Sequence, residues 1–169
     1  MYSLYIIYNS FDLCIHCTLY ITLLTCVFIL DVGSSNNLHS PVAFTAVLTH
    51  NEQLGPLQTL EYDKVITNIG NAYDTRHGHF TAPVNGIYML SATLCDDDQI
   101  IRTEMVKNGV QLVAMYGDTG LLASHTIMVS LEQNDMVWVR HFKEGISTVH
   151  AGSDRYYTSF SGALITALQ

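Results

Sequence analysis

The sequence has little charge, and positive charge is especially scarce. Charged residues make up 13% of the 169 residues, and the seven Lys and Arg side chains are scattered between Lys64 and Arg155 without a run or stripe. Proteins that bind nucleic acid gather basic side chains on one surface, so this distribution argues against nucleic acid as a partner. The formal net charge of −8 favours solubility and identifies no positively charged partner by itself.

Motifs of common catalytic sites are also missing. The sequence contains no nucleophile-elbow serine motif, no phosphate-binding loop, no zinc-protease helix motif and no Cys/His nucleophile signature. His77 and His79 have the spacing of a zinc pair, because alternate residues of a strand share a face. No third ligand is identifiable from the sequence, and a polar loop is the simpler explanation. We therefore expect that the protein is not an enzyme.

Cysteine is sparse, and three of the four cysteines lie near the N-terminus. Cys14 and Cys17 have the spacing of a redox or zinc pair, but they and Cys26 lie in an apolar segment that offers no other ligands. Cys95 is the single cysteine of the remaining chain. In a secreted protein its thiol would either pair with another chain or lie buried and inert.

The N-terminal segment, residues 1–32, is apolar and aromatic. Residues 13–30 are 18 residues without Asp, Glu, Lys or Arg. Roughly 20 residues span a bilayer, whereas the apolar part of a signal peptide has roughly 7–15. We interpret residues 1–32 as a hydrophobic helix that acts as a signal peptide, so that the protein is secreted. The alternative is a signal anchor that holds residues 13–30 in the membrane.

The polar residues 33–40 are predicted to be a linker, and residues 41–169 have the pattern of an antiparallel β-sandwich. After the turn signal Asn85-Gly86, apolar or aromatic residues at positions 88, 90, 92 and 94 alternate with Ile87, Met89, Ser91 and Thr93. Both faces are partly apolar, as in a central strand or one whose outer face meets another subunit. Further strands are predicted at 41–48, 64–67, 100–106, 111–116, 121–131, 136–140 and 158–168, with loops at 51–56 and 143–156.

Four motifs in this part of the chain have specific spacings. The first is V-A-F-T-A at residues 42–46, and the second is F-x5-G-x-Y, formed by Phe80, Gly86 and Tyr88. The third is L-x-x-N-D-x-V-W-V at residues 131–139, which contains Trp138. The closing motif is S-F-S-G-A-L-I at residues 159–165, which contains Phe160 and Gly162.

These motifs, in this order, resemble the globular C1q domain family over about residues 41–167. Asn134 stands where the family usually has glycine, and asparagine tolerates the positive φ of the turn. The resemblance implies an all-β jelly-roll sandwich of about ten antiparallel strands that assembles as a homotrimer. Many relatives carry a collagen stalk, and residues 33–40 contain no Gly-X-Y repeat.

The resemblance also implies a binding module that requires no cofactor. Short secreted members with one domain are similar to lectin-like receptors of innate immunity, which bind carbohydrate or other microbial surface patterns. Trimerisation would raise a weak single-site affinity through avidity. The alternative is a membrane-anchored or secreted cytokine-like ligand that binds a protein receptor, because the tumour necrosis factor family shares the trimeric jelly roll.

The resemblance to the C1q domain family makes calcium an optional ligand. Some relatives hold calcium near the trimer apex with two aspartates, whose nearest counterparts here are Asn108 and Asp118. One of the two positions has lost its charge, and the spacing differs. The run Asp96–Asp98 lacks the spacing of an EF-hand loop, so a solvated loop is the simpler interpretation.

Overall fold

The computed structural model describes residues 40–95, 100–118 and 122–169. They belong to a compact unit that runs from Ser40 to Gln169. No helix among the described residues has the length and apolarity needed to cross a membrane. Several predictions concern residues outside the description: the helix of residues 1–32, most of the linker, Cys14, Cys17, Cys26 and Asp96–Asp98.

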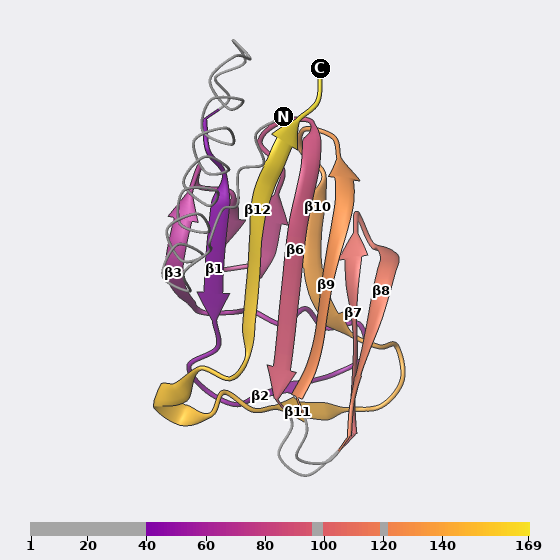
Figure 1. The fold of residues 1–169 in the computed structure, drawn as a ribbon. Coiled ribbons are helices and arrows are strands. Elements are labelled where there is room, and N and C mark those ends of the chain that lie inside the picture. The colour runs from indigo at the N-terminus through magenta and orange to yellow at the C-terminus, as the bar shows by residue number, and fades with distance from the viewer. Residues whose placement is uncertain (1–39, 96–99, 119–121) are drawn as a thin grey trace, which may run out of the picture. The chain divides into compact units, whose positions relative to one another are not determined.

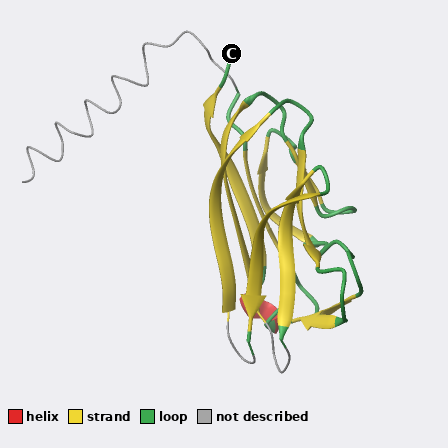
Figure 2. Cartoon of the chain, turned by 90° about the vertical axis from the view of Figure 1, so that its right-hand side faces the viewer, coloured by secondary structure: helices red, strands yellow, loops and turns green. Residues whose placement is uncertain are grey.

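The fold is a sandwich of two five-stranded antiparallel sheets (Figures 1 and 2). In spatial order, the first sheet comprises β3 (Lys64–Ile69), β1 (Ala43–Val47), β12 (Ser159–Ala167), β6 (Gly86–Cys95) and β9 (Leu122–Leu131). The second comprises β4 (Tyr73–Asp74), β5 (His79–Thr81), β10 (Met136–His141), β7 (Ile101–Lys107) and β8 (Val110–Gly117). This architecture agrees with the predicted all-β jelly roll.

The alternation predicted for residues 87–94 is confirmed. Tyr88, Leu90, Ala92 and Leu94 have no exposed surface, whereas the residues between them keep part of their surface accessible. β6 pairs with β12 on one side and with β9 on the other, so it is central in the first sheet. The period-two pattern therefore predicted both the strand and its buried face.

Aromatic rings fill the space between the sheets. Phe44 of β1 stacks on Phe80 of β5 with 4.9 Å between ring centroids, and on Tyr73 of β4 with 5.2 Å. Its edge contacts Phe160 of β12 at 4.9 Å. Because aromatic pairs add about 0.5–1.5 kcal/mol each beyond the burial of their area, this cluster ties the two sheets together.

Besides β4 and β5, for which no strand was predicted, three further short elements were not predicted as regular structure. β2 (Glu52–Leu54) and β11 (Ser147–Val149) lie in segments expected to be loops, and they pair with each other as a small third sheet. The 3-10 turn η1 (Ser153–Arg155) lies in the same expected loop. Strands of three residues are too short for periodicity to mark, and the partners lie about ninety positions apart in the chain.

The turn between β9 and β10 forms as expected for asparagine in place of glycine. Asn134 has φ 73°, in the left-handed region. Asp135 fixes this turn to the β7–β8 turn, because it accepts hydrogen bonds from Lys107 Nζ (2.6 Å) and Asn108 Nδ2 (2.7 Å). Burial alone would raise the pKa of Asp135, but these donors and the backbone N–H of Glu132 outweigh it and lower the pKa.

Phe80→Ala should lower the free energy of unfolding by about 3–5 kcal/mol, because it removes a fully buried ring from the aromatic cluster. Denaturant titration of the wild type and the variant measures the difference. Val110→Ala is the matched control, since Val110 is 70% exposed and its truncation should change stability by less than about 0.5 kcal/mol. A loss below about 1 kcal/mol for Phe80→Ala would contradict its role in the core.

Asp135→Asn should lower the stability at neutral pH by about 1–2 kcal/mol, because the ion pair with Lys107 is lost. The folded-state pKa of this carboxyl is lowered, so its contribution exists above the unfolded pKa and disappears as pH falls through the folded pKa. The difference between wild type and variant should therefore shrink in thermal or denaturant melts as the pH falls through and below about 3.9, the ordinary pKa of an Asp carboxyl. A difference that stays constant over this interval would show that charge is not its cause.

Candidate functional site

The outer face of the first sheet is organised in rows that cross all five strands. The strand registers place one hydroxyl-bearing residue of each strand side by side, and we call this set the hydroxyl row: Thr67, Thr45, Ser161, Ser91 and Thr126. Ser91 Oγ and Thr126 Oγ1 are hydrogen-bonded at 2.8 Å. The row thus presents short polar groups that can donate or accept hydrogen bonds.

A second row, the apolar row, runs parallel to the first. It consists of the residues two positions away on each strand: Ile69, Ala43, Ala163, Met89 and Met128. Met128 is 63% exposed, Ile69 48% and Met89 37%. Methionine is unbranched and adapts its shape to a partner surface, so this row can pack against varied apolar contours.

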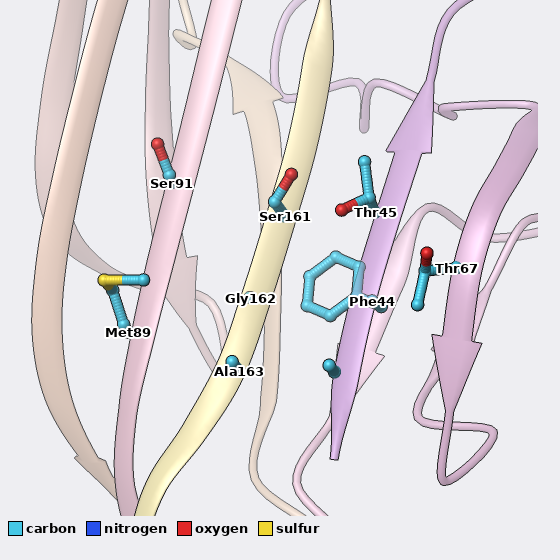
Figure 3. Close-up of a pocket in the computed structure, with 9 residues that line it drawn as sticks. Phe44, Thr45, Thr67, Met89, Ser91, Ser161, Gly162 and Ala163 are labelled. Atoms are coloured by element: carbon cyan, nitrogen blue, oxygen red, sulfur yellow. The ribbon is translucent and has the colours of Figure 1, made fainter. Parts of the chain in front are cut away.

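Residues in the middle of both rows line a shallow pocket of about 250 Å³. Figure 3 shows Thr67, Thr45, Ser161 and Ser91 on four neighbouring strands, with Met89 and Ala163 beside them. A partner that fills this pocket would meet hydroxyl groups on one side and apolar groups on the other. The pocket walls contain no ionisable side chain.

Gly162 allows this part of the sheet to lie close to the core. A Cβ at this position would lie 2.5 Å from Leu90 Cδ2 and 2.6 Å from Phe44 Cε1. The absent side chain leaves room for the ring of Phe44 directly beneath β12. Gly86 is confined in the same way, since a Cβ there would lie 2.5 Å from Leu164 Cδ1 and 2.7 Å from Thr166 O.

Charge is distributed unequally between the two sheets. Among the Asp, Glu, Lys and Arg residues, the strands of the first sheet carry only Lys64, at the beginning of β3. The strands of the second sheet carry Asp74, Arg102, Glu104, Lys107 and Arg140. The hydroxyl and apolar rows together therefore form an uncharged face, by which name we refer to these two rows below.

The sequence alone did not reveal this face. Its signal is present, because serine or threonine recurs at alternate positions, as at Ser91 and Thr93 on β6 or Ser159 and Ser161 on β12. The rows become visible only when five strands are aligned, and that alignment depends on pairings between distant segments.

Most of the remaining motif residues lie in the core of the domain. Phe80, Tyr88 and Phe160 are fully buried, and Tyr88 Oη donates to the carbonyl of Val84 at 2.8 Å. Trp138 is half-buried on the outer face of the second sheet, where its ring lies 4.5 Å from that of His79. Cys95 ends β6 and is half-buried.

The two residues named for calcium do not meet within one chain. Asn108 lies in the β7–β8 turn, where its Nδ2 donates to Asp135 and its Oδ1 accepts from the N–H of Met136 at 2.9 Å. Asp118 is exposed and follows the opposite end of β8, roughly 25–30 Å away at the rise of a strand. Among the described residues, no three His, Cys, Asp or Glu side chains are grouped as a metal site.

The family model of the C1q domain matches residues 43–165. Among curated proteins, the chain is 32% identical to the heavy metal-binding protein HIP of Mytilus edulis over 126 residues, which are 70% of this chain and 59% of that protein. It is 28% identical to complement C1q tumor necrosis factor-related protein 6 of Rattus norvegicus over 142 residues, 81% of this chain and 49% of the relative. The chain therefore spans less than two thirds of the length of these relatives.

Solved structures share the fold at low sequence identity. The globular domain of zebrafish complement 1qA protein has a TM-score of 0.60 at 17% identity, and the match covers 75% of this chain and 99% of that one. The Eiger TNF of S. frugiperda has a TM-score of 0.63 at 11% identity, with 78% and 96% covered. Murine APRIL has a TM-score of 0.55 at 12% identity, with 74% and 99% covered. With the family model matched along most of the compact unit, the chain belongs to the C1q domain family.

Proposed function

We propose that this protein is a secreted homotrimeric recognition module, not an enzyme, in which the uncharged face packs against neighbouring copies. The observation that carries this proposal is the uncharged face itself. Cores of protein interfaces are depleted of charged residues, and a sheet face that met only water would have no reason to exclude them. Proteins of the C1q and TNF fold form trimers and bind ligands or receptors, which supports the same assembly.

The two rows suit an interface in complementary ways. The apolar row supplies area whose burial stabilises the complex by about 25 cal/mol per Å² before the costs of association. The hydroxyl row supplies groups that satisfy one another or the partner, as Ser91 and Thr126 do within one chain. An uncharged interface needs no desolvation of ions, which is the largest cost at buried polar contacts.

The ligand in this proposal is carbohydrate or another repeated pattern on a microbial surface, in a lectin-like role in innate immunity. Three copies of a weak site bound to one surface would gain avidity. Secretion is part of the proposal, with residues 1–32 as the signal peptide. In the alternative topology, residues 13–30 anchor the protein to a membrane.

A cytokine-like ligand that binds a protein receptor is the second candidate. Its support is the likeness to two TNF-family structures, Eiger TNF and APRIL, at TM-scores of 0.63 and 0.55. The likeness concerns the fold alone, so the ligand experiment below distinguishes the two candidates.

Metal ions are optional in this proposal. Trimer formation needs no cofactor. Calcium would bind copies of Asn108 or of Asp118 around the threefold axis, completed by waters, since the two positions lie at opposite ends of β8. The mussel relative is described as heavy metal-binding, which extends the ions to be tested to transition metals.

Sedimentation equilibrium of the protein secreted by a eukaryotic host should give the mass of a trimer, with or without calcium. Ser161→Lys puts an ammonium at the centre of the uncharged face and should yield monomers, because the buried charge would have no partner. Gln133→Lys is the matched control: it adds the same charge at an exposed position of the β9–β10 turn and should leave the trimer intact. A monomeric wild type, or a trimeric Ser161→Lys, would refute assembly through this face.

An array of microbial glycans should bind the wild-type trimer, and the Ser161→Lys monomer should bind about 10²–10⁴-fold more weakly through the loss of avidity. Equal binding by monomer and trimer would exclude the avidity mechanism. If the trimer binds no glycan but saturates a cell-surface protein, the cytokine-like alternative replaces the lectin-like one.

A further inference from the structure

Three aromatic side chains and a carboxylate lie together on the outer face of the second sheet, away from the uncharged face. In the strand register, Asp74 of β4 is opposite His79 of β5, and His79 is opposite Trp138 of β10. His77 lies in the turn between β4 and β5. We propose that His77 and His79 form a binding site for a divalent metal ion such as Cu²⁺, Ni²⁺ or Zn²⁺.

Asp74 orients the ring of His77. The Nδ1 atom of His77 lies 3.0 Å from Asp74 Oδ2. An ionised carboxylate can only accept hydrogen bonds, so Nδ1 must carry the hydrogen, and in the neutral ring Nε2 keeps its lone pair. Metal-binding histidines typically donate their other ring N–H to a carboxylate in this way, which fixes the tautomer and raises the basicity of the ligating nitrogen.

Asp74 is itself held in place. Its Oδ2 accepts from Arg76 Nη2 at 2.9 Å, and its Oδ1 accepts from the backbone N–H of Arg76 at 3.0 Å. The carboxylate thereby also compensates the charge of Arg76, which would otherwise repel a metal ion.

His79 is positioned by a different contact. Its ring lies 4.5 Å from the indole of Trp138, inclined by 31°. The strand register and the indole together give the ring of His79 a defined position on the outer face of the sheet before a metal ion binds.

The two rings are close enough to share one ion. Their centroids lie 6.2 Å apart. With metal–nitrogen bonds of about 2.0–2.1 Å, two imidazoles on a tetrahedral ion have centroids about 5 Å apart. The side chain of His77 is 64% exposed, so a movement of about 1 Å closes the difference without disturbing the sheet.

The composition of the site determines its metal preference. Two imidazole nitrogens favour Cu²⁺, Ni²⁺ and Zn²⁺, whereas Ca²⁺ and Mg²⁺ require oxygen ligands. Among the described residues, no three His, Cys, Asp or Glu side chains are grouped to hold a metal ion, so water or a donor on a ligand would complete the coordination of an ion held by His77 and His79. The site is therefore distinct from the calcium position considered for Asn108 and Asp118.

The fluorescence of Trp138 can report metal binding at this site. It is the single tryptophan of the chain, and paramagnetic Cu²⁺ or Ni²⁺ bound to His79 would quench its fluorescence at contact distance. Titration of the full-length protein with CuCl₂ or NiCl₂ at about pH 7.5 should quench the fluorescence saturably, and CaCl₂ should not quench it. His77→Ala and His79→Ala should each raise the midpoint of the titration about tenfold or more. His125→Ala, which removes an exposed histidine of β9, should leave the midpoint unchanged.

A second pair of variants tests the role of Asp74. Asp74→Asn should weaken binding about tenfold, the lower limit for loss of a carboxylate behind a metal-binding histidine. Arg76→Ala keeps the carboxylate and removes its other partner, so binding should persist. Wild-type midpoints for both His77→Ala and His79→Ala would overturn the site. A wild-type midpoint for Asp74→Asn would overturn the positioning of His77 by the carboxylate.

Discussion

The outer faces of both sheets depend on the contacts that the ring of Phe44 makes in the core. It touches rings from both sheets, Phe160 on its own side and Phe80 and Tyr73 on the other. The ring fits because position 162 on the neighbouring strand is glycine. Since side chains alternate along a strand, the inward position of Phe44 fixes Thr45 and Ala43 as outward-facing. The core contact thereby determines which residues can meet a partner.

Sequence reasoning succeeded where the signal is local. The F-x5-G-x-Y spacing identified Phe80, Gly86 and Tyr88, and alternation identified the buried face of β6. Asn134 was expected to tolerate positive φ, and it does. In each case a few neighbouring residues contain the whole physical constraint, because a turn or a strand face is decided within one segment. These local signals alone predict an antiparallel β-sandwich, and the jelly roll was implied by the resemblance of the four motifs to the C1q domain family.

The candidate sites were harder to foresee, because they arise from pairings between distant segments. The hydroxyl row brings Thr45 beside Ser161, which lies more than one hundred positions away in the chain. His77 and His79 were singled out by their spacing, but the sequence offered no third group. Strand pairing supplies Trp138 through β10, and β4 supplies Asp74, which contacts His77 across the β4–β5 turn. Composition and periodicity hold no information about such neighbours, whereas a backbone register fixes them at once.

The unequal charge of the two sheets has a functional consequence. Burying a sheet face between subunits strongly penalises unpaired ions, so the proposed assembly would account for the hydroxyl and apolar side chains of the uncharged face. The second sheet is free of that restriction and carries ion pairs such as Arg140–Glu104, at 2.7 Å, next to the half-buried Trp138. Its charged and aromatic groups include those of the proposed metal site. Because these groups belong to the sheet opposite the uncharged face, a change in ligand preference would leave the proposed trimer contact intact. In this proposal the domain can diversify its ligands while one sheet stays dedicated to assembly.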